Sequence, residues 1–398
     1  VVNNSDSEVT INLGVNVGLD YNDLSLEDNQ HLFEKSKLVS DVLLDNIGSN
    51  GDYYDDGDDT FITGEDPNNY IWYSGKLWRA LSINNEARTV KLVTQWNISA
   101  INYSSGSTAF EGSYMEEWLN DTTVDGFLGN LRDPEDFIVM DYKWNATVMT
   151  DTSKPAETTM VENAVGLLNY YEYITSYIGA SPSTGYLNNG LYWWALTPYS
   201  DSIIRNVNID GVASDIGPFD ADGVRPSINL KSDVKIVGGD GTEDNPYRLN
   251  GDNDTDLSGT LLSSRYSGEY VKFGNDENNL YRIVSHETEG LTKITSDNTL
   301  KNNDSFVTLA FGSDTTFSST NTIGAFLNGE YLTSYVDNEY RVMIEDNTTW
   351  YLGTVGTNST YSYKHAKYTD ATGATLTSST TAAKIGLLRT GELMSGQF

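Results

Sequence analysis

An internal repeat is the feature that most constrains what this chain can fold into. Four short blocks recur in the same order, and the first reads Tyr, aliphatic, any residue, aromatic, a Gly-containing turn, then Leu-aromatic-Arg-x-aliphatic-Ser. The four pairs of blocks are 70–82 with 270–285, 91–94 with 292–295, 118–120 with 326–328, and 164–172 with 384–392. The distance between copies widens along the chain, so the insertions fall between blocks, where loops are expected. The sequence therefore predicts two tandem copies of one domain.

The pattern within one copy predicts mostly strands. Residues 70–73 and 77–82 alternate around a Ser74-Gly75 turn, which indicates a β-hairpin. Further strands are expected at 89–94, 192–196 and 223–230, a short helix at 115–119, and a strand followed by a helix over 161–174. Pro226 cannot donate to a ladder, so the last strand is expected at a sheet edge. The fold class is a β-rich α+β protein.

These signals divide the chain into five parts. They are a strand-like arm at 1–20, an acidic helix and loop connector at 21–68, the first copy at 69–231, a β-hairpin linker at 232–260, and an incomplete second copy at 261–398.

Charge and composition exclude several classes of function. The chain carries 57 acidic and 24 basic residues and no cysteine. The absence of cysteine excludes a disulfide scaffold, a thiolate zinc site and a cysteine nucleophile. The net charge of −33 argues against a nucleic-acid partner, which requires clustered Lys and Arg. No apolar run approaches the ~18 residues of a membrane span. The abundance of Tyr, Thr, Asn and Gly favours an extracellular protein processed from a secreted precursor.

Five segments carry a resemblance to a known group of proteins. They are 69–84, 164–174, 186–199, 223–236 and 239–249, and they include the closing Gly223-Val224-Arg225-Pro226 motif. Together they resemble uncharacterised bacterial cell-surface repeat domains with a fold like that of C-type lectins and sulfatase-modifying factors. The resemblance implies a fold and a surface location, and no activity. The cysteines of both groups and the sugar-binding triplets of calcium-dependent lectins are absent here; Trp118-Leu119-Asn120-Asp121 is a near miss.

The arm offers a way to complete the second copy. The first copy continues past its fourth block through an aromatic strand to Leu230, whereas the second reaches Phe398 just after its fourth block. The arm's apolar residues, expected to act in assembly, alternate with other residues: Val9, Ile11, Leu13, Val15 and Val17. Residues 11–13 repeat the Ile-Asn-Leu of 228–230. We therefore expect the arm to add a strand to an incomplete copy, its own or a neighbour's; a shortened or truncated second copy is the alternative.

Candidate chemistry is sparse. Asp252, Asp254 and Asp256 stand at alternate positions, as at the start of a calcium loop, although Leu257 replaces the expected Gly. Calcium is the one cofactor considered, and a solvated acidic loop is the alternative. No catalytic site is expected, although several acidic residues could pair for glycoside cleavage: Glu116, Glu117, Asp133, Glu135 and Asp136.

These observations predict an extracellular structural subunit of the cell surface rather than an enzyme. It is expected to associate with itself head to tail, by donation of the N-terminal strand, into a filament, a pilus-like fibre or a surface layer. The alternative is a monomeric adhesin whose loops over 187–222 recognise a glycan or a protein. A hydrolase is a distant third reading.

Overall fold

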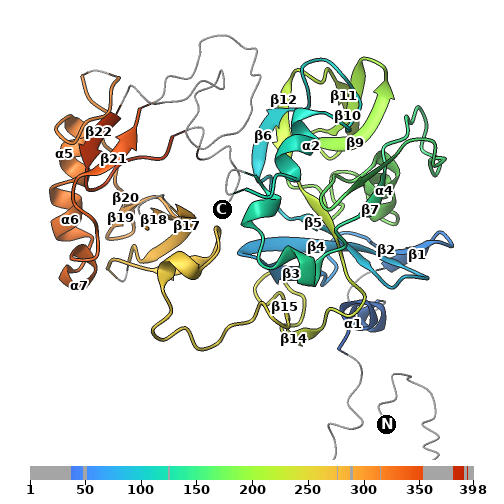
Figure 1. The fold of residues 1–398 in the computed structure, drawn as a ribbon, viewed down its shortest axis with the longest axis horizontal. Coiled ribbons are helices and arrows are strands. Elements are labelled where there is room, and N and C mark those ends of the chain that lie inside the picture. Colours follow the sequence, from blue (N-terminus) through green and yellow to red (C-terminus); the bar gives the residue numbers. More distant parts are fainter. Residues whose placement is uncertain are drawn as a thin grey trace, which may run out of the picture.

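A computed structural model describes residues 37–47, 52–123, 126–275, 277–286, 290–313, 315–352, 380–389 and 392. Within them the chain is rich in strands, which confirms the β-rich α+β class. Figure 1 shows two units side by side: a first unit from α1 to β15 and a second from β16 to β22. None of the helices in these ranges is long and apolar enough to cross a membrane.

An eight-stranded sheet forms the base of the first unit. Its path runs β1-β2-β4-β3-β15-β14, and β5 and β13 extend it from the other side of β4. The long strand β4 accommodates both β2 and β3 on one edge, one at each end. The members are β1 (Asp52–Asp55), β2 (Asp59–Thr63), β3 (Tyr70–Tyr73), β4 (Lys76–Asn84), β5 (Val90–Thr94), β13 (Ser227–Leu230), β14 (Ile236–Gly238) and β15 (Tyr247–Leu249).

A second sheet and several short helices complete this unit. The sheet has the order β11-β10-β9-β12-β6, and β7 and β8 form a separate ribbon. Its strands are β6 (Ser99–Asn102), β9 (Trp193–Ser200), β10 (Ile203–Val207), β11 (Ala213–Ile216) and β12 (Ala221–Val224), with β7 (Tyr142–Asn145) and β8 (Met160–Asn163) in the ribbon. The helices are α1 (Val39–Asn46), α2 (Tyr114–Leu119), η3 (Leu128–Asn130), α3 (Pro134–Phe137) and α4 (Tyr170–Ser176).

The core of the first unit lies in two clusters. Trp194 belongs to the larger cluster and Trp193 to the smaller. Both are at most 1% exposed, although strand alternation predicts that only one of them enters a core. The reason is that both faces of β9 are covered: the Trp193 ring packs edge-on against Tyr173, and the Arg225 guanidinium lies over it.

The second unit is smaller. A three-stranded antiparallel sheet, β16-β17-β18, lies beside two short ribbons, and helices α5, α6 and α7 run along its outer side (Figure 1). The strands are β16 (Tyr270–Lys272), β17 (Leu280–His286), β18 (Thr292–Ser296), β19 (Lys301–Asn302), β20 (Ser305–Phe306), β21 (Thr348–Tyr351) and β22 (Thr380–Ala383). The helices are η4 (Leu262–Ser264), α5 (Thr322–Leu327), α6 (Glu330–Ser334) and α7 (Asn338–Arg341).

The hairpin predicted as a linker is part of the first unit's sheet, because β15 pairs in parallel with β3. The two units then meet at the turn between β3 and β4. The Lys76 ammonium donates to the carbonyl of Ser267 at 3.2 Å, and the Arg282 guanidinium donates to that of Gly75, also at 3.2 Å. Gly75 has φ +72°, and a Cβ there would lie 2.6 Å from the Ser267 oxygen, so this close approach requires glycine.

Candidate functional site

The strand β13 closes the sheet of the first unit beside β5. β13 pairs antiparallel with β5, in the register Ser227 to Val93 and Leu230 to Val90. Its other edge meets the chain at Gly166, which exchanges two backbone hydrogen bonds with Ser227, at 3.0 and 2.8 Å. The Ser227 hydroxyl also donates to the Leu92 carbonyl at 2.6 Å. β13 is therefore held from both sides.

The side chains of β13 fill the centre of the unit. Ile228 and Leu230 are fully buried and belong to the larger core cluster. Every residue of β5 is buried as well. Removing β13 would expose this apolar surface together with a row of backbone donors and acceptors.

The second unit repeats the anchoring contacts around this position. Asn120, which follows α2, exchanges two hydrogen bonds of 2.9 Å with the backbone of Val165. Asn328, which follows α5, makes the same pair with Ile385, at 2.9 and 3.0 Å.

A tryptophan and a glycine form a second matched pair. A Cβ on Gly166 would lie 2.4 Å from the Trp144 ring, and a Cβ on Gly386 would lie 2.5 Å from the Trp350 ring. In each unit the glycine packs flat on the indole. The indole nitrogens donate to a backbone carbonyl in both cases, at 2.8 and 3.0 Å.

A lysine–glutamate ion pair is the third contact that the two units share. Lys91 of β5 pairs with Glu172 of α4, and Lys293 of β18 pairs with Glu392. Burial alone would lower the pKa of Lys91, but Glu172 and Tyr142 outweigh it and raise that pKa above its ordinary value.

In the described part of the second unit, no strand fills the position that β13 fills in the first. β18 corresponds to β5 and pairs with β17, while no strand pairs with its outer edge among the residues that the structure describes. All five residues of β5 are buried, whereas those of β18 are partly or fully exposed. Leu387 is 44% exposed, although its counterpart Leu167 is fully buried.

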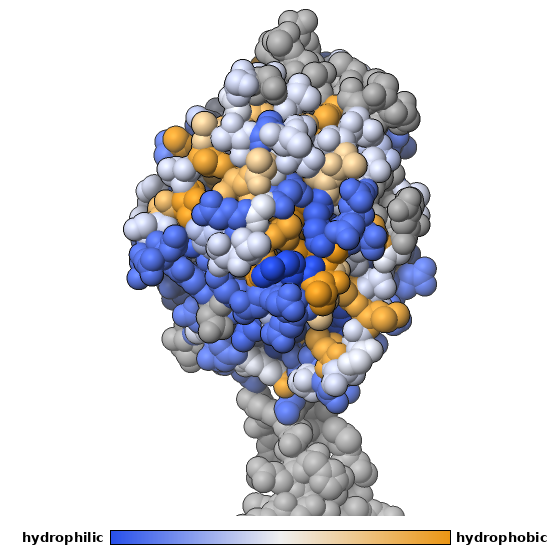
Figure 2. Space-filling view, turned by 90° about the vertical axis from the view of Figure 1, so that its left-hand side faces the viewer, coloured by the Kyte–Doolittle hydropathy of each residue, from blue (hydrophilic) through white to orange (hydrophobic). Residues whose placement is uncertain are grey.

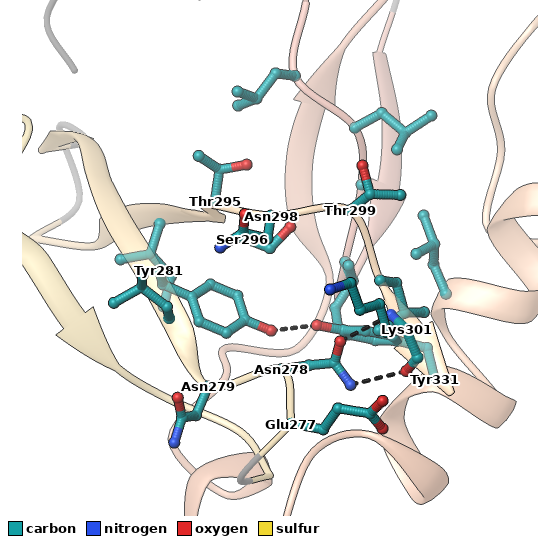
Figure 3. A pocket seen from close by; sticks show the side chains of 18 of the residues that line it. Glu277, Asn278, Asn279, Tyr281, Thr295, Ser296, Asn298, Thr299, Lys301 and Tyr331 are labelled. Carbon is teal, nitrogen blue, oxygen red and sulfur yellow. Dashed lines mark hydrogen bonds between the residues drawn. The ribbon is translucent and has the colours of Figure 1, made fainter. Parts of the chain in front are cut away.

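A hollow of about 370 Å³ lies at this open position. Its walls come from β17, β18 and the segment 385–388, together with Leu327, Tyr331 and Trp350. Figure 3 shows Tyr281 pointing across the hollow toward Tyr331, with which its hydroxyl makes a hydrogen bond, and Asn278 beside Lys301. Burial is the main cause that raises the pKa of Tyr281 well above its ordinary value, so this wall is a neutral, satisfied hydrogen-bonding pair.

The face that carries the second unit is mixed in character. Figure 2 shows apolar patches interrupted by hydrophilic side chains on this side of the molecule. The exposed large apolar residues of this unit include Phe306, Leu309, Phe311, Val342, Met343 and Leu387.

The residues predicted to act in assembly lie outside the described residues. These are Val9, Ile11, Leu13, Val15 and Val17. Their role stays a prediction.

The three aspartates predicted to bind calcium hold other partners. Asp252 accepts from the Ser74 amide at 2.8 Å and from Arg132 at 3.1 Å. Asp254 bridges Arg132 and Arg265, at 2.7 and 2.6 Å, and the two arginines lower its pKa to about 2. Asp256 caps a turn by accepting from the Ser258 amide. In the described ranges no three acidic or histidine side chains are grouped as metal ligands. The alternate spacing suggested calcium, but an ion bound at these three residues would have to displace Arg132 and Arg265.

The acidic residues considered for glycoside cleavage have separate surroundings. Glu116 accepts from the Gly112 amide and from the Asn163 side chain, at 2.5 and 2.7 Å, so it ties α2 to β8. Asp133 lies 3.7 Å from Arg132, and Glu135 and Asp136 are in the first turn of α3.

The loops named for ligand recognition, 187–222, include Tyr192, which is 48% exposed. Outside that range, between β5 and β6, Trp96 is 50% exposed, and Asn97 donates to the Tyr192 carbonyl at 2.9 Å. Asn189 donates to the Asn97 side chain at 3.0 Å. Aromatic rings beside amides are a surface that a sugar ring could contact.

Sequence reasoning did not find the hollow. Tyr331 and the 298–301 segment of its lining lie between the repeated blocks, where the repeat gives no signal. One signal was available in the sequence. The repeated blocks predict β18 and the segment 384–388 but no strand that lies between the two in space, so exposed side chains are expected there.

Comparisons of the chain with models of known protein families, with curated proteins and with solved structures found no match.

Proposed function

We propose that this protein is an extracellular structural subunit of a cell surface, composed of two tandem C-type-lectin-like units, which associates with itself by donation of its N-terminal strand. One observation carries the proposal: β13 completes the first unit between β5 and Gly166, and the matching position between β18 and Gly386 is open among the described residues.

The matched contacts support a common ancestry of the two units. The hydrogen bonds from Asn120 and Asn328 to the backbone, the glycine–tryptophan contacts and the lysine–glutamate ion pairs all surround the same position. A shared β-bulge adds to them, since the register shifts at Ala80/Ser82 in the first unit and at Ile283/Ser285 in the second. Bulges are positional features that families retain.

The physics of the open position supports assembly. An exposed edge strand is a template for another strand, and added backbone hydrogen bonds give affinity while side-chain pockets give specificity. A donor that comes from a neighbour makes a head-to-tail contact, which produces an open fibre. The net charge of −33 keeps such a subunit soluble before assembly.

The test is self-association without any added ligand. Size analysis and negative-stain microscopy of the intact chain should show oligomers or fibres, and a chain lacking residues 1–19 should stay monomeric. A monomer in both cases, at concentrations of tens of micromolar, would overturn the proposal.

A monomeric adhesin is the second function that a specific observation favours. Trp96 and Tyr192 are exposed, and Asn97 and Asn189 lie near Tyr192 and bond to each other, which is a surface suited to a glycan. Binding of the intact chain to a glycan array, lost in Trp96→Ala, combined with a monomeric state, would favour this function over assembly.

A further inference from the structure

We propose that the hollow beside β18 is the seat of one particular strand, Thr10–Leu13 of a second copy, with Ile11 and Leu13 as the side chains that fill it. This inference rests on the proposed function and adds the occupant, the register and the residues in contact.

The register follows from the first unit. There Ser227 lies opposite Val93, Ile228 opposite Leu92, and Leu230 opposite Val90. The corresponding positions of β18 are Thr295, Ile294 and Thr292. A strand placed in the same way puts Thr10 opposite Thr295, Ile11 opposite Ile294 and Leu13 opposite Thr292.

The side chains of the arm match those of β13 position by position. Residues 10–13 read Thr-Ile-Asn-Leu and residues 227–230 read Ser-Ile-Asn-Leu. The Ser227 hydroxyl donates to the Leu92 carbonyl, and Thr10 brings a hydroxyl to the equivalent carbonyl, that of Ile294. The match therefore covers the polar contact as well as the two apolar residues.

The walls of the hollow correspond to the residues that surround Ile228 and Leu230. Leu92, Trp78, Trp144 and Val165 share the core cluster with those two side chains. Their counterparts are Ile294, Tyr281, Trp350 and Ile385, and all four line the hollow. Tyr281 stands where the first unit has Trp78. Because the Tyr281 hydroxyl already has a hydrogen-bond partner in Tyr331, an aliphatic side chain can enter the hollow without leaving that hydroxyl unsatisfied.

The backbone of β18 offers the required donors. In the first unit the Thr94 amide points outward and donates to the Pro226 carbonyl at 3.1 Å. The alternation along β18 aims the amides of Thr292, Ile294 and Ser296 in the same direction, since the neighbouring Asp297 amide points inward to Leu280.

A second copy as the donor follows from the proposed head-to-tail assembly, in which the arm of one chain enters the next. Lys37, the first described residue, accepts from the Ile236 amide at the edge of β14, next to α1. Figure 1 places α1 and β14 under the first unit and β18 within the second, on the other side of the joint.

Engineered disulfides test the register directly, because the chain has no cysteine of its own. Thr10 and Thr295 would form a non-hydrogen-bonded pair, whose ~4.5 Å Cα separation suits a disulfide. Equal amounts of a Thr10→Cys chain and a Thr295→Cys chain are mixed and oxidised. We expect mixed dimers at a yield about tenfold above that of Ile11→Cys with Thr295→Cys, since a one-residue slip turns the side chain to the other face.

Each other outcome has a distinct meaning. Assemblies that form but cross-link through Ile11→Cys, or through neither residue, overturn the register and leave the proposed function standing. A Thr10→Cys/Thr295→Cys double variant that closes within monomers overturns the second copy as the donor. No assembly and no cross-link overturn both proposals. If circular dichroism shows that the Thr295→Cys variant does not fold, a Val9→Cys chain mixed with a Ser296→Cys chain tests the same register.

Discussion

Gly166 and Ser227 exchange two backbone hydrogen bonds, and a Cβ on Gly166 would lie 2.4 Å from the ring of Trp144. This glycine therefore supports the closing strand with its backbone while its α-carbon rests on the indole. Gly386 lies on Trp350 in the same manner, and no strand meets it among the described residues. The proposed strand donation depends on this difference between the two glycines.

The first prediction concerns the packing of that glycine. Gly166→Ala should destabilise the protein by ~1–3 kcal/mol, because the new methyl group has no space beside the indole. The measurement is the urea midpoint. Gly238→Ala is the matched control, since its Cβ would meet only the Arg248 side chain, at 3.9 Å, and it should be close to neutral. Equal effects of the two substitutions would contradict the packing described here.

The second prediction concerns the buried ion pair. Lys91→Met should cost ~3–5 kcal/mol, because it leaves the Glu172 carboxylate buried without its partner. The double variant Lys91→Met/Glu172→Met should recover part of that loss in chemical denaturation. Arg88→Met breaks a partly exposed pair with Asp41 and should cost no more than ~1 kcal/mol. A Lys91→Met chain as stable as the Arg88→Met chain would show that the pair is not buried.

The third prediction concerns pH and the joint between the units. Burial lowers the pKa of Lys76 to about 7, and the lysine of the unfolded chain titrates near 10.5. Between these values the unfolded state binds one proton more than the folded state, so this residue makes stability rise with pH. From pH 7 to pH 9 its contribution should grow by ~2 kcal/mol.

Lys76→Met should remove this rise. The comparison is the difference in unfolding free energy between the two proteins at pH 7 and pH 9. A difference that does not change with pH would mean that Lys76 keeps an ordinary pKa.

The fourth prediction concerns calcium. Arg132 and Arg265 already neutralise Asp254, and Asp252 is held by Arg132 and the Ser74 amide. We expect neither 5 mM calcium nor a chelator to shift the melting temperature. Asp252→Ala should lower it, because the buried Ser74 amide then loses its acceptor. A calcium-dependent rise in melting temperature that Asp254→Asn abolishes would instead support a calcium site.

The sequence predicted the local elements of the fold well. The hairpin around Ser74-Gly75, the helix ending at Leu119 and the strand-to-helix passage around Gly166 all form, because turn residues and apolar periodicity act over a few neighbours. The long-range pairings were less accessible. The parallel pairing of β15 with β3 joins a hairpin to a strand about 175 residues earlier in the chain, and no local pattern specifies such a contact.

The candidate site was predictable in part. The repeat predicted an unpaired strand edge in the second unit, but not that the walls around that edge would enclose a hollow. The alternating aspartates suggested a metal because spacing alone cannot show that Arg132, some 120 residues away, reaches Asp252. The burial of both Trp193 and Trp194 depended on a second layer over β9, which a strand pattern does not reveal.

The most direct test of strand donation separates donor from acceptor. A chain lacking residues 1–19 keeps the groove but has no arm, and an Ile294→Pro chain keeps the arm but loses a central outward amide of β18. Each should be monomeric alone, and an equimolar mixture should give a one-to-one dimer that grows no further, as measured by light scattering after size exclusion. A mixture that stays monomeric, or an arm-less chain that assembles by itself, would contradict the account.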